Sequence, residues 1–208
     1  MESKGIFIVF EGIDGSGKTT QLKRTKEYLL GRGYDVVETR EPGGTAISEN
    51  IREILLDPAN QKMSAECELL LYSASRAQHI SEVIAPALKA GKAVLCDRFS
   101  LSTVAYQGYG RGIDRDKILA IRDAASLGAD PDLTFIIDVP VELAAERVSR
   151  SRDLPKDRLE QEKSDFFKRV RDGFLSESEA DERLIVIDGR DAEDEVFGRV
   201  RAVLETIL

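Results

Sequence analysis

The sequence predicts an α/β fold in which five parallel strands form one sheet with helices on both faces. Short continuous apolar runs, rich in β-branched residues, alternate with helical patterns along the whole chain. The first run ends in a glycine-rich turn of the phosphate-binding type. The 208 residues contain no internal repeat, linker or low-complexity tract, so we expect a single domain over residues 1–208.

The expected strands are apolar runs bounded by turn signals or by helical patterns. They lie at residues 6–11, 34–38, 93–96, 133–138 and 184–187. Ser48 is expected to cap a helix whose apolar face includes Ile51 and Leu55, and a longer helix is expected over about 65–88. Because ligands of such sheets bind beyond the carboxyl ends of the strands, the residues just after each strand are the functional candidates.

Composition narrows the class of partner. The net charge of -8 argues against sequence-independent nucleic-acid binding, which depends on basic surfaces. No apolar run approaches the roughly 20 residues of a membrane span, and the chain enters a strand too early for a secretory signal. Cys67 and Cys96 lack metal-ligand spacing. We expect a cytoplasmic protein with reduced thiols that acts on small molecules.

The strongest motif is G-x-x-x-x-G-K-T, placed between an apolar strand and a helical pattern. Its glycines allow backbone N–H groups to turn around an anion, Lys18 would reach the β- and γ-phosphates, and Thr19 would be a Mg²⁺ ligand. A chance glycine-rich turn is the weaker interpretation, since both flanking elements are present. The predicted ATP-binding residues of this turn are Gly12, Ile13, Asp14, Gly15, Ser16, Gly17, Lys18, Thr19 and Thr20.

Charged residues follow the second and third strands. Arg40 and Glu41 precede a sharply turned Pro-Gly-Gly, where the isomer of the bond before Pro42 stays open, and a structural turn with solvated charges is the alternative. Asp97 ends the third strand, where such enzymes place the carboxylate that organises Mg²⁺. Arg98 beside it offers a planar fork suited to phosphate.

Two pairs of side chains are suited to a flat ring and a sugar. Tyr72 and Arg76 are four residues apart on the long helix and share a face, and Tyr106 and Gln107 follow Ser102. A packed tyrosine with a snorkelling arginine, and an ordinary tyrosine beside a surface glutamine, are the competing interpretations. The single histidine, on a polar helix flank, is expected to have no role.

A basic segment follows the fourth strand and its helix. It carries five cations within twelve residues, namely Arg147, Arg150, Arg152, Lys156 and Arg158. A mobile basic lid at about 148–160 would neutralise charge on a transferred phosphoryl group and exclude water. A solvated charged helix is the alternative.

Taken together, these motifs resemble those of thymidylate kinases, which transfer the γ-phosphoryl group of ATP to dTMP. The resemblance runs from residue 6 to about 190 and is carried by Phe10–Thr20, Arg40–Thr45, Asp97–Phe99, Ser102 with Ala105–Gly108, and Asp157–Glu160 with Phe166–Phe167. It implies a homodimer that uses Mg²⁺ with ATP.

The resemblance also implies roles on the dTMP side. Asp14 would accept a hydrogen bond from the 3′-hydroxyl, and Arg98 would bind the 5′-phosphate, with Ser102 beside it. Tyr72 would stack on thymine and Arg76 would bond its exocyclic oxygen. The remaining implied contacts are those of Tyr106 at the deoxyribose, Gln107 at the base, and Arg40 and Glu41 near the reacting groups.

For ATP, the resemblance places Arg147 over adenine, which the backbone near 188–190 would border. The family divides on whether its catalytic arginine stands in the P-loop, at the position of Gly15, or in the lid. Gly15 together with Arg150 and Arg152 indicates the second, mostly bacterial group. Tyr72 stands where phenylalanine is more usual, and its hydroxyl then needs a polar partner or water.

Two other functions compete with this interpretation. A deoxynucleoside kinase would need a carboxylate base for a neutral hydroxyl acceptor, and Glu41 is the residue that could be mistaken for one. A regulatory P-loop ATPase would hydrolyse ATP without an acceptor and would have little use for the Tyr72/Arg76 and Tyr106/Gln107 pairs.

Overall fold

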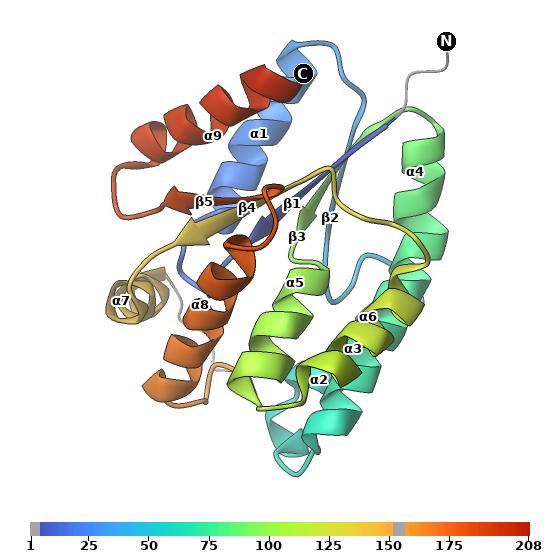
Figure 1. Cartoon of the computed structure of the whole chain (residues 1–208), viewed down its shortest axis with the longest axis vertical. Coiled ribbons are helices and arrows are strands. Elements are labelled where there is room, and N and C mark those ends of the chain that lie inside the picture. Colours follow the sequence, from blue (N-terminus) through green and yellow to red (C-terminus); the bar gives the residue numbers. More distant parts are fainter. Residues whose placement is uncertain (1–4, 152–156) are drawn as a thin grey trace.

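The computed structural model describes residues 5–151 and 157–208 (Figure 1). Within these residues five parallel strands form one sheet in the order β2-β3-β1-β4-β5, which confirms the expected fold class. The strands are β1 (Ile6–Glu11), β2 (Val36–Arg40), β3 (Ala93–Asp97), β4 (Leu133–Asp138) and β5 (Leu184–Asp188).

Helices connect every pair of successive strands in the described chain. Their bounds are α1 (Lys18–Gly31), α2 (Ala46–Leu56), η1 (Pro58–Asn60), α3 (Ala65–His79), η2 (Ile80–Ile84), α4 (Ala85–Lys89), α5 (Ser100–Thr103), η3 (Val104–Gly110), α6 (Arg115–Ser126), α7 (Val141–Ser151), α8 (Ser164–Ser178) and α9 (Glu193–Ile207). The long helix expected over 65–88 is present as α3, η2 and α4 in succession. Its middle segment η2, like η3, has π-helical hydrogen bonding, a form that occurs often at functional sites.

Two sequence-based boundaries are wrong for local reasons. The second strand begins at Val36 rather than at Tyr34, because the Tyr34 N–H donates to the Leu29 carbonyl (3.1 Å) and so closes the end of α1. Helix α2 is capped by Thr45, whose hydroxyl accepts the Ser48 N–H at 3.1 Å. Ser48 itself is buried and donates from its hydroxyl to the Ser75 carbonyl on α3.

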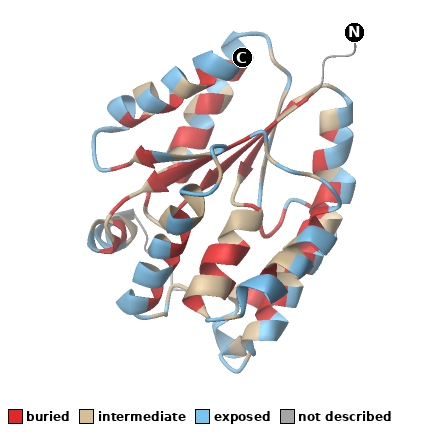
Figure 2. Cartoon of the chain, in the orientation of Figure 1, coloured by how far each residue is buried: buried red, intermediate tan, exposed pale blue. Residues whose placement is uncertain are grey.

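The core lies on both faces of the sheet, because successive strand residues point to opposite sides. On one face the strands pack against α1 and α9, and on the other against η2, α4 and α8 (Figures 1 and 2). Cys96 is buried on the face of the sheet that η2 and α4 cover, and Cys67 is exposed; both are free thiols. No helix of the described chain is long and apolar enough to cross a membrane.

The strand register positions the candidate residues. Asp97 lies opposite both Phe10 on β1 and Arg40 on β2, so the carboxyl ends of these three neighbouring strands are level. The turn after β1, the turn after β2 and the turn after β3 therefore meet at one edge of the sheet.

Candidate active site

The turn after β1 has the backbone of a phosphate-binding loop. Gly12, Gly15 and Gly17 all have positive φ, and a Cβ at Gly15 would lie 2.3 Å from the Ala144 carbonyl oxygen. Only glycine fits such a position. Helix α1 begins at Lys18, so its free N–H groups and the positive end of its dipole face the loop.

Asp14 gathers two cations at the mouth of this loop. Its Oδ1 lies 3.0 Å from Lys18 Nζ and 2.8 Å from Arg98 Nη2. Burial would raise the pKa of Asp14, but the charges of Lys18 and Arg98 outweigh it and hold that pKa well below its usual range. The carboxylate is still 44% exposed, so it can also reach a ligand.

An oxygen pair suited to magnesium stands on the other side of Lys18. The Thr19 hydroxyl donates to Asp97 Oδ2 at 2.6 Å, which places an alcohol and a carboxylate together beside the loop. In the described residues no three His, Cys, Asp or Glu side chains are grouped as a metal site. Mg²⁺ in nucleotide sites is usually held by one or two protein oxygens together with phosphates and water, so these residues fit it.

A buried glutamate, which the sequence analysis did not single out, fixes the turn after β3. Glu11 accepts hydrogen bonds from the Phe99 N–H (2.8 Å), the Ser102 N–H (3.0 Å) and the Ser102 hydroxyl (2.5 Å). Burial raises the pKa of Glu11 to about 7. The turn holds Arg98 at φ 70, an uncommon conformation for a non-glycine residue, and aims its guanidinium back toward Asp14. The sequence feature that could have identified Glu11 is a glutamate at the end of an apolar strand.

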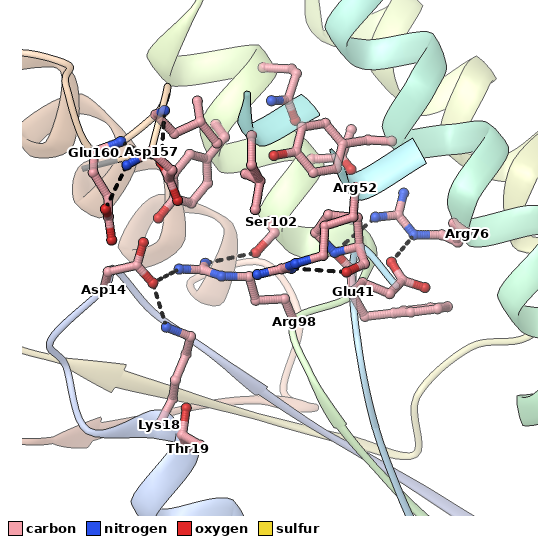
Figure 3. A pocket seen from close by; sticks show the side chains of 18 of the residues that line it. Asp14, Lys18, Thr19, Glu41, Arg52, Arg76, Arg98, Ser102, Asp157 and Glu160 are labelled. Atoms are coloured by element: carbon pink, nitrogen blue, oxygen red, sulfur yellow. Dashed lines mark hydrogen bonds and ion pairs between the residues drawn. The ribbon is translucent and has the colours of Figure 1, made fainter. Parts of the chain in front are cut away.

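These residues open onto a cavity of about 390 Å³ (Figure 3). Most of the expected substrate side chains line it, and they come from separate parts of the chain. Its lining comprises Asp14, Gly15, Lys18, Thr19, Glu41, Pro42, Arg52, Leu56, Tyr72, Arg76, Arg98, Phe99, Ser102, Thr103, Tyr106, Gln107, Val148, Asp157, Leu159 and Glu160.

One end of the cavity rests on a buried charged network. Arg76 is only 2% exposed; its Nε donates to Glu41 Oε2 at 2.8 Å and its Nη2 donates to the Phe99 carbonyl at 3.1 Å. Among the described residues its Nη1 has no hydrogen-bond partner. Because an unpaired buried donor is costly, this nitrogen is suited to a ligand acceptor.

The histidine belongs to the same network, so the expectation that it lies on a polar flank of the helix is wrong. His79 is fully buried, with Nδ1 3.1 Å from Glu41 Oε1 and Nε2 2.6 Å from the Thr39 hydroxyl. Sequence position on a polar flank did not reveal that α3 turns this flank onto the sheet. The Glu41–Pro42 bond, left open by the sequence, is cis.

An aromatic wall faces this network. Tyr106 lies beneath Arg98, whose guanidinium carbon is 5.0 Å from the ring centroid, and contacts Phe166 and Phe174 edge-on. Burial raises the pKa values of Tyr106 and Tyr72 above that of a free phenol, so both remain neutral at physiological pH.

Three of the expected arginines lie outside the cavity lining, as do Asp97 and several residues of the phosphate-binding loop, and a fourth arginine lies outside the described residues. Arg40 forms a bidentate pair with Glu49 at 2.9 Å. Arg147 donates to the Gly189 carbonyl at 3.0 Å, close to the phosphate-binding loop. Arg150 is exposed and pairs with Glu146 on α7, while Arg152 falls in the stretch that the structure does not describe.

The cavity also contains residues that the sequence analysis did not assign. Arg52 on α2 projects into it and donates to the Pro42 carbonyl at 2.9 Å (Figure 3). Asp157 caps the next turn by accepting the N–H groups of Leu159 and Glu160, both at 2.9 Å. In the sequence, Arg52 is a single cation on a helix and Asp157 a typical turn residue. Both features are too common to indicate a site.

A phosphate-binding loop that shares one cavity with a second set of base- and phosphate-suited side chains, on a five-stranded parallel sheet, defines a P-loop kinase of the nucleoside monophosphate kinase type. The comparisons with known proteins specify the family. The sequence profile described as "Thymidylate kinase" matches residues 10–200.

Individual relatives of the chain are also thymidylate kinases. The thymidylate kinase of Pelotomaculum thermopropionicum is 49% identical over 206 residues, covering 99% of this chain and 95% of its own. That of Geobacter sulfurreducens is 49% identical over 205 residues, covering 96% of each chain. The crystal structure of thymidylate kinase from Ehrlichia chaffeensis superposes with a TM-score of 0.79 at 38% identity, covering 96% of this chain and 98% of that one. The chain belongs to the thymidylate kinase family, as the motifs indicated.

Proposed function

We propose that this enzyme transfers the γ-phosphoryl group of ATP to dTMP to give dTDP. One observation carries the proposal: a single cavity joins the phosphate-binding loop to the Tyr72/Arg76 and Tyr106/Gln107 pairs. A hydrolase would need the loop alone, whereas a kinase needs an acceptor site within reach of it.

The acceptor nucleotide is assigned from the chemistry of the cavity wall. Tyr72 stacks on thymine, and the unpaired Arg76 Nη1 donates to an exocyclic oxygen of the base. Gln107 completes base recognition and Tyr106 packs against the deoxyribose. The phosphate end is bound by Arg98 and Ser102, and Asp14 accepts from the 3′-hydroxyl; Arg40 stands at the edge of this site.

ATP occupies the phosphate-binding loop over residues 12–20, with Arg147 against adenine. Thr19 and Asp97 would hold Mg²⁺ together with phosphate oxygens, and the ion would supply positive charge against the β- and γ-phosphates. Lys18 contacts the transferred group from the loop side, and the lid arginines Arg150 and Arg152 are assigned to neutralising its charge.

Transfer requires no strong general base. The second pKa of a phosphate monoester is about 6, so the attacking oxygen of dTMP is already ionised at neutral pH. Catalysis is then positioning for in-line attack and neutralisation of charge by Lys18, Arg98, the metal and the lid.

The competing functions are disfavoured by the same geometry. A deoxynucleoside kinase needs a free carboxylate base, yet both Glu41 oxygens are engaged, one by Arg76 and the other by His79. A regulatory ATPase has no acceptor substrate, so it would not need the part of the cavity that the Tyr72/Arg76 and Tyr106/Gln107 pairs line. Family membership also favours the dTMP reaction over both.

We further propose a single domain with a lid over about 148–160 that acts as a cytoplasmic homodimer. The dimer proposal rests on exposed aliphatic side chains of the packed helices α2 and α3: Ile47 is 53% exposed, Ile54 47% and Leu70 57%. Where such exposed apolar groups form one contiguous patch, the patch is typical of an interface.

The test is a coupled ADP-release assay with ATP and Mg²⁺ that offers dTMP, dUMP, thymidine, AMP and no acceptor in parallel. Fast turnover with dTMP and slower turnover with dUMP, with none for the other acceptors, supports the proposal. Turnover with thymidine alone would indicate a nucleoside kinase, and slow acceptor-independent hydrolysis would leave only the phosphate-binding loop assigned.

A further inference from the structure

A buried carboxylate that lies outside the cavity contacts the side chain proposed to recognise the base. Glu68 stands on α3 four residues before Tyr72, so it shares a helical face with Tyr72 and Arg76. It is 1% exposed, and its Oε1 accepts a hydrogen bond from Gln107 Nε2 at 2.8 Å. Gln107 itself is buried in the π-helical segment η3 and lines the cavity.

Two guanidiniums hold this carboxylate in place. Arg111 donates to Oε1 from Nε (3.1 Å) and to Oε2 from Nη2 (3.0 Å), while Arg158 donates to Oε2 at 2.6 Å. Arg158 is also fixed to the end of α2 through the Leu55 carbonyl at 2.8 Å. Burial would raise the pKa of Glu68, but these donors outweigh it and the pKa is lowered, so the group stays ionised.

An ionised carboxylate only accepts hydrogen bonds, which determines the orientation of its amide partner. Gln107 must turn its NH₂ toward Glu68, and its carbonyl oxygen is then the end available to a ligand. A carbonyl acceptor pairs with a ring N–H donor. Thymine and uracil carry such a donor at N3, whereas N3 of cytosine is itself an acceptor.

We propose that Glu68 is a positioning residue which, by locking the Gln107 amide with its carbonyl toward the base, makes the acceptor site select bases that carry a ring N–H. The inference rests on the proposed dTMP kinase function. A purely structural role for Glu68, as the partner of Arg111 and Arg158, is the alternative to be tested.

The substitution Glu68→Gln distinguishes the two. Two guanidinium donors, from Arg111 Nη2 and Arg158 Nη2, contact Oε2, and one weaker donor, Arg111 Nε, contacts Oε1. The single carbonyl of the introduced amide is therefore favoured at the Oε2 position, and its NH₂ then faces Gln107. The Gln107 amide then inverts and presents its NH₂ to the base. We expect the KM for dTMP to rise about tenfold and the ratio of kcat/KM for dTMP over dCMP to fall about tenfold or more, with the KM for ATP unchanged.

A second substitution tests the orientation directly. When Glu68→Gln is combined with Gln107→Glu, residue 107 is an acceptor on every side, so it takes the hydrogen bond from the amide at position 68 and still offers an oxygen to the base. Selectivity for dTMP over dCMP is expected to return. Glu162→Gln is the matched control, because Glu162 pairs with Arg111 in the same cluster and, among the described residues, forms no hydrogen bond with Gln107.

The outcomes separate cleanly. A folded Glu68→Gln variant with an unchanged dTMP:dCMP ratio, or a double variant that does not regain selectivity, overturns the proposal. If Glu68→Gln does not fold, NMR of the unmodified protein decides: the Gln107 side-chain NH₂ should be protected from solvent exchange with and without dTMP, and rapid exchange in both states overturns the lock. Absence of dTMP turnover in the unmodified protein refutes the proposed function instead, and the NMR result still reports on the lock.

Discussion

Replacing Arg98 with alanine tests whether catalysis depends on a preorganised cation at the phosphate. The side chain is 14% exposed, is held by Asp14 and Ser102, and lies over Tyr106, so it is fixed before substrate binds. Removing one preorganised donor to the reacting group costs about 10²–10³-fold in rate, or roughly 3–4 kcal/mol of transition-state stabilisation. We expect a loss of that size in kcat/KM for dTMP.

The same change should affect stability much less. The Arg98–Asp14 pair is partly solvated, since Asp14 is 44% exposed, so it contributes about 1 kcal/mol at most, against a total stability of about 5–15 kcal/mol. Arg98→Lys keeps the charge without the planar fork and should be intermediate in rate. Arg201→Ala, an exposed change on α9, is the control. A folded Arg98→Ala enzyme within a factor of about three of the parent kcat/KM would refute the reasoning.

Three further predictions follow from the geometry. Arg76→Met leaves Glu41 buried without its guanidinium and should lower the free energy of unfolding by about 3–5 kcal/mol in urea titrations; a loss below about 1 kcal/mol would mean that the pair is not desolvated. Gly15→Ala should raise the KM for ATP far more than Gly17→Ala: both glycines have positive φ, but only at Gly15 does a Cβ meet a backbone carbonyl, so equal effects would contradict the steric argument. Glu11 binds a proton more tightly folded than unfolded, because burial raises its pKa from 4.5 to about 7; its contribution to stability is therefore full below pH 4.5 and lost as pH rises through 7. Urea unfolding at about pH 5 and about pH 8 should show this loss in the parent but not in Glu11→Gln, and equal losses would show that the hydrogen bonds to Glu11 outweigh burial.

The parts of the site that the sequence predicted are those governed by local rules. The phosphate-binding loop needs a strand, a positive-φ turn and a helix start in immediate succession, and all three are visible in residues 6–20. Parallel pairing then brings the ends of neighbouring strands to one edge, which is why Asp97 and Glu41 were correctly expected near the loop.

The residues that escaped prediction depend on which way a helix face turns. His79 and Glu68 look like solvated polar positions on α3, yet both are buried because α3 packs against α2, α6 and η3. Arg158 was counted among the cations of a basic lid, but it is 5% exposed and bonded to Glu68. No local pattern distinguishes a charged side chain that finds a buried partner distant in sequence from one that faces water.

An acidic chain with a net charge of -8 thus builds a site for two anionic nucleotides by placing carboxylates behind cations. Glu41 holds Arg76, Asp14 holds Arg98, and Glu68 holds Arg158, each at 2.8 Å or less. A carboxylate paired with a guanidinium fixes its direction at little further entropic cost, and at Arg76 and Arg98 it leaves other N–H groups for a ligand in the cavity. The attraction is consequently local, because outside the site the net negative charge of the protein repels anions within a Debye length of its surface, about 8–10 Å, and is screened beyond that distance. Added salt should therefore screen that repulsion and leave the association rate with dTMP unchanged or higher. A basic nucleotide-binding surface would respond in the opposite way. A steep fall in the association rate with rising ionic strength would argue against this division between local and net charge.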